Sequence, residues 1–330
     1  QQFLTYTNTF ADVHNLDLLF GHEMYNRKSY GLYGSKTMMF SPDNTELSGA
    51  VVDSSRSGSS VLEYNNEGYF FRGQYDYDNR IYFSGSYRRD ASSRFHPDHR
   101  WGNFWSLGAA WIINRESWFN ASWVNMLKVK ASYGSQGNDK IGDYRYVDTY
   151  RLASSNGEMS VAFLEKGNPN ITWETNTNFN AGIEFGVLQN RISGSIEYFN
   201  RKTTDMLMAF PTAPSLGYSS YYANVGDMSN KGIEVDLNFT PIRSKNVQWD
   251  INVNLTHLKN KIISLPPERR TKEVEGYYGY AGSSFFYGQG LPLYTFYMKK
   301  YAGVSEDGRS MWYKDVTDKD GKPTGERTTT

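Results

Sequence analysis

Apolar and polar residues alternate with a period of two over long stretches of the chain. The alternation runs through residues 127–133, 179–187, 233–239 and 249–256. Because successive side chains of a β-strand point to opposite faces, each of these segments has one apolar face and one polar face. The pattern therefore predicts an all-β protein.

We predict about eleven strands, and many of them are longer than ordinary globular strands. A typical globular strand has about 5–6 residues, whereas a tilted strand that spans a membrane needs about 9–11. The predicted strands lie near residues 1–10, 13–25, 62–75, 80–90, 102–114, 126–135, 174–187, 191–203, 229–240, 246–258 and 291–302.

The connections between these strands alternate between short and long. The long ones, at 26–61, 136–173, 204–228 and 259–290, all fall on the same side of the predicted sheet. Outer-membrane barrels have short periplasmic turns and long extracellular loops, whereas a sandwich gives no reason for such an asymmetry. The fold predicted is an antiparallel transmembrane β-barrel.

Composition narrows the function classes. The chain has 330 residues, with 35 basic and 35 acidic side chains and no cysteine. Zero net charge gives no field that would hold nucleic acid, and the lack of cysteine excludes disulfides and thiol catalysis. No apolar run approaches the roughly 18 residues of a spanning helix. Aromatic residues make up 16% of the chain, and their places near strand ends favour interfacial girdles over ordinary strand formers.

Several stretches resemble the SusC/RagA family of TonB-dependent outer-membrane transporters of Bacteroidetes-type bacteria. The resemblance covers about residues 1–304, in order and spacing. It is carried by Gly85–Phe95 (GSYRRDASSRF), Arg100–Trp111 (RWGNFWSLGAAW), Leu127–Asn138 (LKVKASYGSQGN), Trp173–Thr175 leading into Asn180–Phe185 (NAGIEF), Arg191–Thr203 (RISGSIEYFNRKT) and Asn224–Glu234 (NVGDMSNKGIE).

The resemblance implies a plug domain, a TonB box and a 22-stranded barrel. We expect residues 1–330 to be part of that one barrel domain, about eleven of its strands, with the plug, the signal peptide and the C-terminal strands outside this fragment. The implied function is import of oligosaccharides or peptides through the outer membrane, energised by the TonB–ExbB–ExbD complex and aided by a SusD-like surface lipoprotein. The lipid bilayer is then a further partner.

Two other functions remain open. One is a siderophore or cobalamin receptor on the same architecture, and the other is a soluble β-rich carbohydrate-binding protein or enzyme. No motif for a catalytic serine, a zinc protease or a thiol nucleophile occurs, so we expect no enzyme, no catalytic residue and no cofactor. His96-Pro97-Asp98-His99 is a weak metal signal in a loop, and we expect no metal site.

Charged residues gather where a predicted strand passes into a loop. Arg88, Arg89, Asp90 and Arg94 form a candidate lumen or rim group. These side chains either steer substrate and contact the plug, or form a salt-bridge network that fixes the strands, and we favour the network. Glu184 and Glu197 lie on alternating strands and are expected to face a wet lumen.

Aromatic residues in two long loops are the candidate substrate-binding residues. Tyrosine and phenylalanine rings stack on sugar rings or peptide groups, and the tyrosine hydroxyl adds hydrogen bonds at the edge. The alternative is that these rings pack the loops against one another or against a partner. The candidates are Tyr218, Tyr221, Tyr222, Tyr277, Tyr278, Tyr280, Phe285, Phe286 and Tyr287.

Overall fold

The structure is a computed structural model that describes residues 1–317, 319 and 323–329. The chain divides into two compact units, residues 1–259 and 260–330, and each is described by itself. In the part of the chain that the structure describes, no helix has the length and apolar character needed to cross a membrane.

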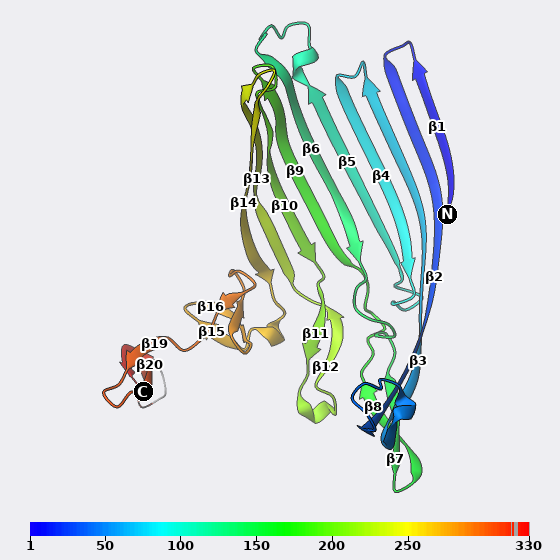
Figure 1. The fold of residues 1–330 in the computed structure, drawn as a ribbon, viewed down its shortest axis with the longest axis vertical. Helices are drawn as coiled ribbons and strands as arrows, with labels where there is room; N and C mark the ends of the chain where they lie inside the picture. The colour runs from blue at the N-terminus through cyan, green and yellow to red at the C-terminus, as the bar shows by residue number, and fades with distance from the viewer. Residues whose placement is uncertain (318, 320–322, 330) are drawn as a thin grey trace. The chain divides into compact units, whose positions relative to one another are not determined.

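Ten long strands form one antiparallel sheet in which each strand pairs with the next long strand along the chain (Figure 1). The first ten predicted strands are confirmed. The strands are β1 (Gln2–Phe10), β2 (His14–Met39), β3 (Ala50–Tyr77), β4 (Ile81–Ser92), β5 (Trp101–Ile112), β6 (Val124–Asn138), β9 (Glu174–Val187), β10 (Ile192–Thr204), β13 (Asp227–Arg243) and β14 (Gln248–Ser264).

Short turns join the strands at one end of the sheet, the upper end in Figure 1. Between β3 and β4, Asp78 and Asn79 have φ angles of 50° and 52°, and the backbone N–H of Arg80 donates to the Tyr77 carbonyl at 2.9 Å. Aspartate and asparagine tolerate this left-handed region, which tight hairpin turns require. A short 3₁₀ helix, Ile113–Arg115, lies in the longer link between β5 and β6.

The long connections at the other end carry small hairpins of their own. The connection between β6 and β9 contains β7 (Thr149–Ser155) and β8 (Glu158–Glu165), and the connection between β10 and β13 contains β11 (Leu207–Pro211) and β12 (Ser220–Asn224). Two of the predicted long connections, 136–173 and 204–228, therefore lie at the end opposite the short turns.

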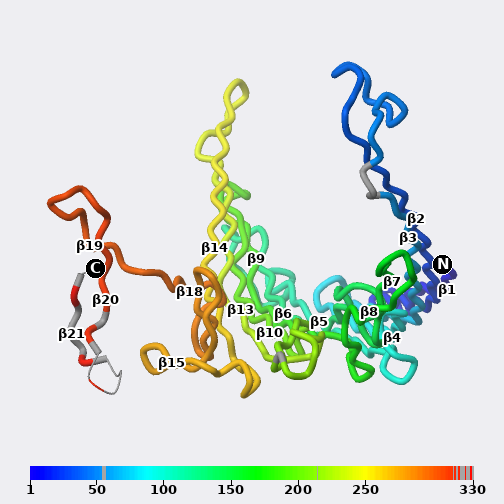
Figure 2. The backbone as a smooth tube through the Cα atoms, turned by 90° about the horizontal axis from the view of Figure 1, so that it is seen from below, coloured from blue at the N-terminus to red at the C-terminus, as the bar shows by residue number. Residues whose placement is uncertain are grey.

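The predicted loop 26–61 is wrong for most of its length. Pairing of β2 with β3 continues to Met39 opposite Ala50, whereas β4 ends at Ser92 opposite Asn66. Figure 2 shows this two-stranded arm, drawn in blue, continuing past β4. Cross-strand contacts support it, such as Lys28 Nζ at 2.5 Å from Glu63 Oε1. The 3₁₀ turn Leu47–Gly49 leads into β3.

The second unit contains short strands. One small sheet consists of β15 (Lys272–Val274), β16 (Tyr277–Ala281), β17 (Phe285–Gly288) and β18 (Thr295–Phe296), and another of β19 (Tyr301–Val304), β20 (Ser310–Thr317) and β21 (Pro323–Thr329). The eleventh predicted strand, 291–302, is therefore wrong: only β18 and the start of β19 fall within it. Its aromatic side chains pack on β17 instead, with Phe296 stacked on Phe285 at 5.4 Å.

The register of the long sheet separates two faces. One row, Ile81, Trp111, Val129, Ile183 and Ile196, is apolar across five strands. The apolar face is open to its surroundings: Leu107 is 61% exposed and Phe83 54% exposed. Such a continuous apolar face is typical of contact with lipid rather than with water.

Candidate functional site

The polar face of the sheet carries an ion-pair ladder over three strands. Lys130 Nζ lies 2.9 Å from Glu184 Oε1 and 2.8 Å from Glu197 Oε2, and Lys128 Nζ lies 3.2 Å from the other Glu184 oxygen. Gly182 is the residue opposite both Lys130 and Glu197, so no side chain separates the two charges. Glu184 and Glu197 thus lie on the polar face, where they are paired.

A second set of charges lies on the polar face near the long-loop end. Arg88 Nε is 2.7 Å from both Asp90 carboxylate oxygens, and Arg88 Nη2 is 3.6 Å from Glu23. Asp90 is only 8% exposed. Opposite it stands Gly68, where a Cβ would lie 2.2 Å from Asp90 Oδ1, so a glycine leaves the room that this carboxylate needs. The contacts favour the salt-bridge interpretation of Arg88 and Asp90.

Arg89 points the other way. It is the register partner of Tyr69 and Asn103, whose side chains share the apolar face with Phe83 and Leu107. Its guanidinium carbon lies 4.9 Å from the centre of the Trp101 ring. The expected group of rim charges is therefore split between two faces, because neighbouring residues of a strand point to opposite sides.

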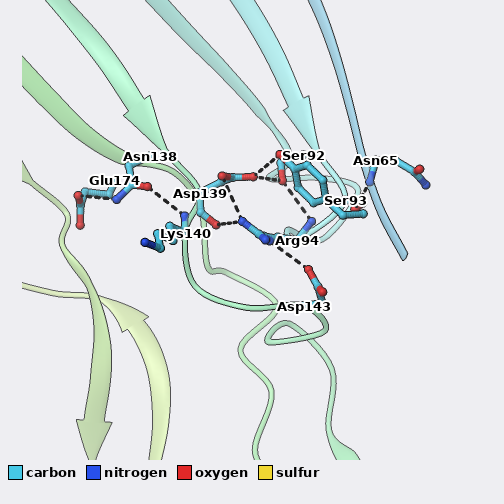
Figure 3. A network of polar contacts seen from close by, with 10 residues as sticks. Asn65, Ser92, Ser93, Arg94, Asn138, Asp139, Lys140, Asp143 and Glu174 are labelled. Carbon is cyan, nitrogen blue, oxygen red and sulfur yellow. Dashed lines mark hydrogen bonds and ion pairs between the residues drawn. The ribbon is translucent and has the colours of Figure 1, made fainter. Parts of the chain in front are cut away.

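Arg94 is the centre of a polar network beyond the end of β4 (Figure 3). Its Nε donates to Asp143 Oδ1 at 3.0 Å, and its Nη1 lies 3.4 Å from Asp139 Oδ1. Asp139 Oδ2 accepts hydrogen bonds from the hydroxyls of Ser92 at 2.6 Å and Tyr64 at 2.9 Å. The network joins the arm, the β4–β5 connection and the start of the β6–β9 connection.

A small apolar core lies beside this network. Phe95 and Ile171 are 0% exposed, and Trp173 packs on Phe95 with ring centres 5.4 Å apart. The Trp173 indole N–H donates to the Arg100 carbonyl at 2.8 Å. We call this group, with Phe104 and Ile141, the rim core. It holds the bases of the β4–β5 and β6–β9 connections together.

The tyrosines of the β10–β13 connection are only partly available to a ligand. Tyr222 packs against the rim core, and Arg145 lies 4.5 Å above its ring. Tyr221 contacts Phe210 edge-on at 5.6 Å. Tyr218 lies 6.2 Å from Phe163 of the neighbouring hairpin. All three are half-buried, so each has one covered side and one open side.

The aromatic residues of the second unit differ in their exposure. Tyr277 is 41% exposed and Tyr278 53% exposed, whereas Phe286 is 1% exposed. The Tyr280 and Tyr287 rings stack at 4.9 Å, and burial raises the pKa of Tyr280. Phe285 lies between Tyr294 and Phe296. Phe286, which was expected to contact a ligand, is buried in this unit and leaves no open side for one.

Sequence reasoning missed Lys130, Asp139 and Trp173. The first could have been found, because it alternates with apolar residues in 127–133 and therefore shares a face with Glu184. The partners of Asp139 are 47 and 75 positions away in the sequence, and no local pattern indicates them.

Comparisons with known proteins agree with this geometry. The family described as "TonB dependent receptor-like, beta-barrel" matches residues 1–323. TonB-dependent receptor P39 of Formosa agariphila is 28% identical over 272 residues, 81% of this chain and 26% of that protein. TonB-dependent receptor SusC of Bacteroides thetaiotaomicron is 31% identical over 265 residues, 77% of this chain and 26% of that protein. The RagAB peptide importer in its "closed-closed" state superposes with a TM-score of 0.84 at 28% identity, over 99% of this chain and 36% of that chain.

The chain belongs to the TonB-dependent receptor-like β-barrel family. It is similar to SusC and RagA-type members, and the resemblance stated from its motifs is confirmed. The family consists of transporters of the Gram-negative outer membrane, not of enzymes. The chain spans between 26% and 36% of the length of these relatives. The ten-stranded sheet is thus a part of a barrel wall, with its polar face toward the lumen and its apolar face toward lipid.

Proposed function

We propose that the full-length protein imports a soluble nutrient, a peptide or an oligosaccharide, through the outer membrane. The observation that supports this most is the similarity of 99% of the chain to the RagAB peptide importer at a TM-score of 0.84. A barrel wall whose polar face carries charges of both signs suits the passage of a hydrated molecule.

A peptide is the first substrate class to test. RagAB is a peptide importer, and at 28% identity this chain is a relative of it rather than a chance match of fold. The lumen wall offers a row of amides, Asn176, Asn178 and Asn180, beside the ion-pair ladder. Amides donate and accept hydrogen bonds, as peptide groups do.

An oligosaccharide is the second class. Tyr277 and Tyr278 present rings that are about half exposed, and such rings stack on the apolar faces of sugars. We therefore keep as proposed binding residues the loop aromatics with an accessible side: Tyr218, Tyr221, Tyr222, Tyr277, Tyr278, Tyr280, Phe285 and Tyr287.

The proposed partners follow from the same similarity. A SusD-like surface lipoprotein is expected to cover the long-loop end, as the two-component name RagAB suggests for that transporter. Energy is expected to come from the TonB–ExbB–ExbD complex. Both partners belong to the proposal for the whole protein, because this chain covers only 36% of the length of that transporter chain.

Uptake by cells separates the two substrate classes. A deletion strain complemented with the full-length gene should accumulate a labelled peptide mixture, and a protonophore that collapses the proton-motive force should abolish accumulation without abolishing surface binding. Accumulation of labelled oligosaccharides alone would identify oligosaccharides as the imported substrate. If neither accumulates above the level of the deletion strain, the import proposal fails.

A double variant sharpens the test of the loops. Tyr277→Ala with Tyr278→Ala should raise the substrate concentration for half-maximal uptake about tenfold, the equivalent of about 1.4 kcal/mol. The matched control is Tyr30→Ala on the β2–β3 arm, a tyrosine that is 74% exposed. Equal uptake by both variants would show that these two tyrosines do not bind the substrate.

A further inference from the structure

Arg89 is a cation on the face of the sheet that meets lipid. Its strand neighbours on that face are Ala91 and Tyr87, and its cross-strand partners are Tyr69 and Asn103. Arg88, one residue earlier, is satisfied by carboxylates on the polar face. Arg89 makes no ion pair with any residue in the described part of the chain.

Aromatic rings frame this guanidinium. It lies 4.9 Å from the centre of the Trp101 ring, and Tyr69 stacks on Trp101 at 6.3 Å. The three side chains are exposed, Tyr69 by 41% and Trp101 by 37%. A ring beneath an arginine holds its plane while its N–H groups stay available.

The carboxylate nearest in register is already engaged. Glu67, opposite Ala91, accepts a hydrogen bond from the Tyr69 hydroxyl at 2.8 Å and lies 3.3 Å from His22. It therefore does not neutralise Arg89, and its own charge is partly offset by these partners.

The height of Arg89 on the sheet matches a headgroup layer. Ile81, at the short-turn end of the same strand, pairs with Trp111. Eight residues separate Ile81 from Arg89, about 26 Å along the strand. A tilt of roughly 40° reduces this to about 20 Å, close to the apolar band of about 25 Å. The long-loop end of such barrels is extracellular, so Arg89 lies at the outer leaflet.

We propose that Arg89, framed by Tyr69 and Trp101, binds the phosphate of a phosphorylated outer-leaflet lipid. Arginine binds phosphate through paired N–H donors, and these bonds are stronger at the edge of an apolar layer than in water. The acyl chains of the same lipid lie against the apolar face below, over Leu107 and Phe83. The site is separate from the lumen, so it is independent of the imported substrate.

Lipid binding by the full-length protein in detergent tests this proposal. The probes are lipid A and the same lipid A without its phosphate groups, counted per protein by native mass spectrometry. Wild type should prefer the phosphorylated form about tenfold, the equivalent of about 1.4 kcal/mol, because the other form lacks the hydrogen-bonded charge pair with Arg89. Arg89→Gln should lose this preference, and Arg89→Lys should retain only part of it.

Arg201→Gln is the matched control. Arg201 is also exposed and also lies over an aromatic ring, 5.0 Å from that of Phe199, but on the lumen face. It should bind lipid A as wild type does. Equal binding of both lipids by wild type, or an unchanged preference in Arg89→Gln, would overturn the proposal. Binding of inorganic phosphate at Arg89 by a wild type that shows no preference between the two lipids would assign the site to free phosphate and overturn the lipid as the ligand. Heat-dependent gel migration checks that every variant is folded.

Discussion

The two ends of the ten-stranded sheet are stabilised in different ways. At the short-turn end, a tight turn such as 78–80 depends on left-handed backbone angles and on short-range hydrogen bonds, among them those from the Arg80 N–H to the Tyr77 carbonyl and from the Asn79 N–H to Asp76 Oδ1. At the long-loop end, the rim core and the Arg94 network join segments that are distant in the sequence. A substitution in a short turn is therefore expected to destabilise mainly that turn. A substitution in the rim core or in the Arg94 network is expected to destabilise several connections at once.

The largest effect is expected in the rim core. Phe95→Ala should destabilise this core by about 3–5 kcal/mol, because a fully buried phenylalanine leaves a cavity. Hydrogen exchange in full-length protein should then accelerate in residues 93–100 and 139–173 and stay unchanged in the turns of the other end.

The control for this change is Phe83→Ala, on the apolar face and 54% exposed. It should leave exchange in both connections at the wild-type level. Equal acceleration by the two variants would show that the rim core is not a separate unit of stability.

The second-largest loss of stability is expected when the Asp139 carboxylate is removed. Asp139→Ala removes the acceptor of Ser92 and Tyr64 and should cost about 1–3 kcal/mol, since Ser92 is fully buried and Tyr64 partly buried. Limited proteolysis of residues 139–148 reports the change. Asp98→Ala, at a side chain 78% exposed beside His96, should change cleavage little. Resistance equal to wild type in Asp139→Ala would contradict the importance of the network.

A turn variant tests the other end of the sheet. Asn79→Val should lower stability by about 1–2 kcal/mol, because a β-branched residue is strained at a φ of 52°. Asn79→Gly should be neutral or stabilising. Chemical unfolding in detergent gives the two midpoints, and loop exchange at the far end should not respond. A lower midpoint for glycine than for valine would refute the backbone explanation.

The smallest effect is a dependence on pH in the β6–β9 connection. The Gly167 N–H and the Lys166 ammonium lower the pKa of Asp148. A lowered folded pKa means that the contact stabilises above the ordinary value of about 3.9 and is lost as the pH falls through the folded pKa. The protection factor of the Gly167 N–H, which corrects for the slower intrinsic exchange at low pH, should therefore fall between pH 5 and pH 3 in wild type. In Asp148→Asn it should already be low at pH 5, and a fall across this range equal to that of wild type would exclude Asp148 as the titrating group.

The sequence predicted the positions of the strands more accurately than it predicted which side chains contact one another. Alternation in 179–187 is a local property, so it determines both the strand and its faces. The same rule also separates Arg88 from Arg89, yet a cluster of charges in the sequence suggested one group. The aromatic run after Leu291 resembled a strand, and only its packing on Phe285 shows otherwise. The network around Asp139 depends on three connections that meet in space.

The ion-pair ladder of Lys130, Glu184 and Glu197 has a consequence for assembly. If β6 slipped by one residue against β9, every side chain of the strand would change face. Lys130 would then leave both of its glutamates and face the lipid, at a cost that rises from about 0–1 kcal/mol near the interface to about 2–4 kcal/mol at the bilayer midplane. The ladder thus disfavours a shifted register of β6 against β9 during insertion. The charges therefore help to select the correct strand pairing while the barrel forms.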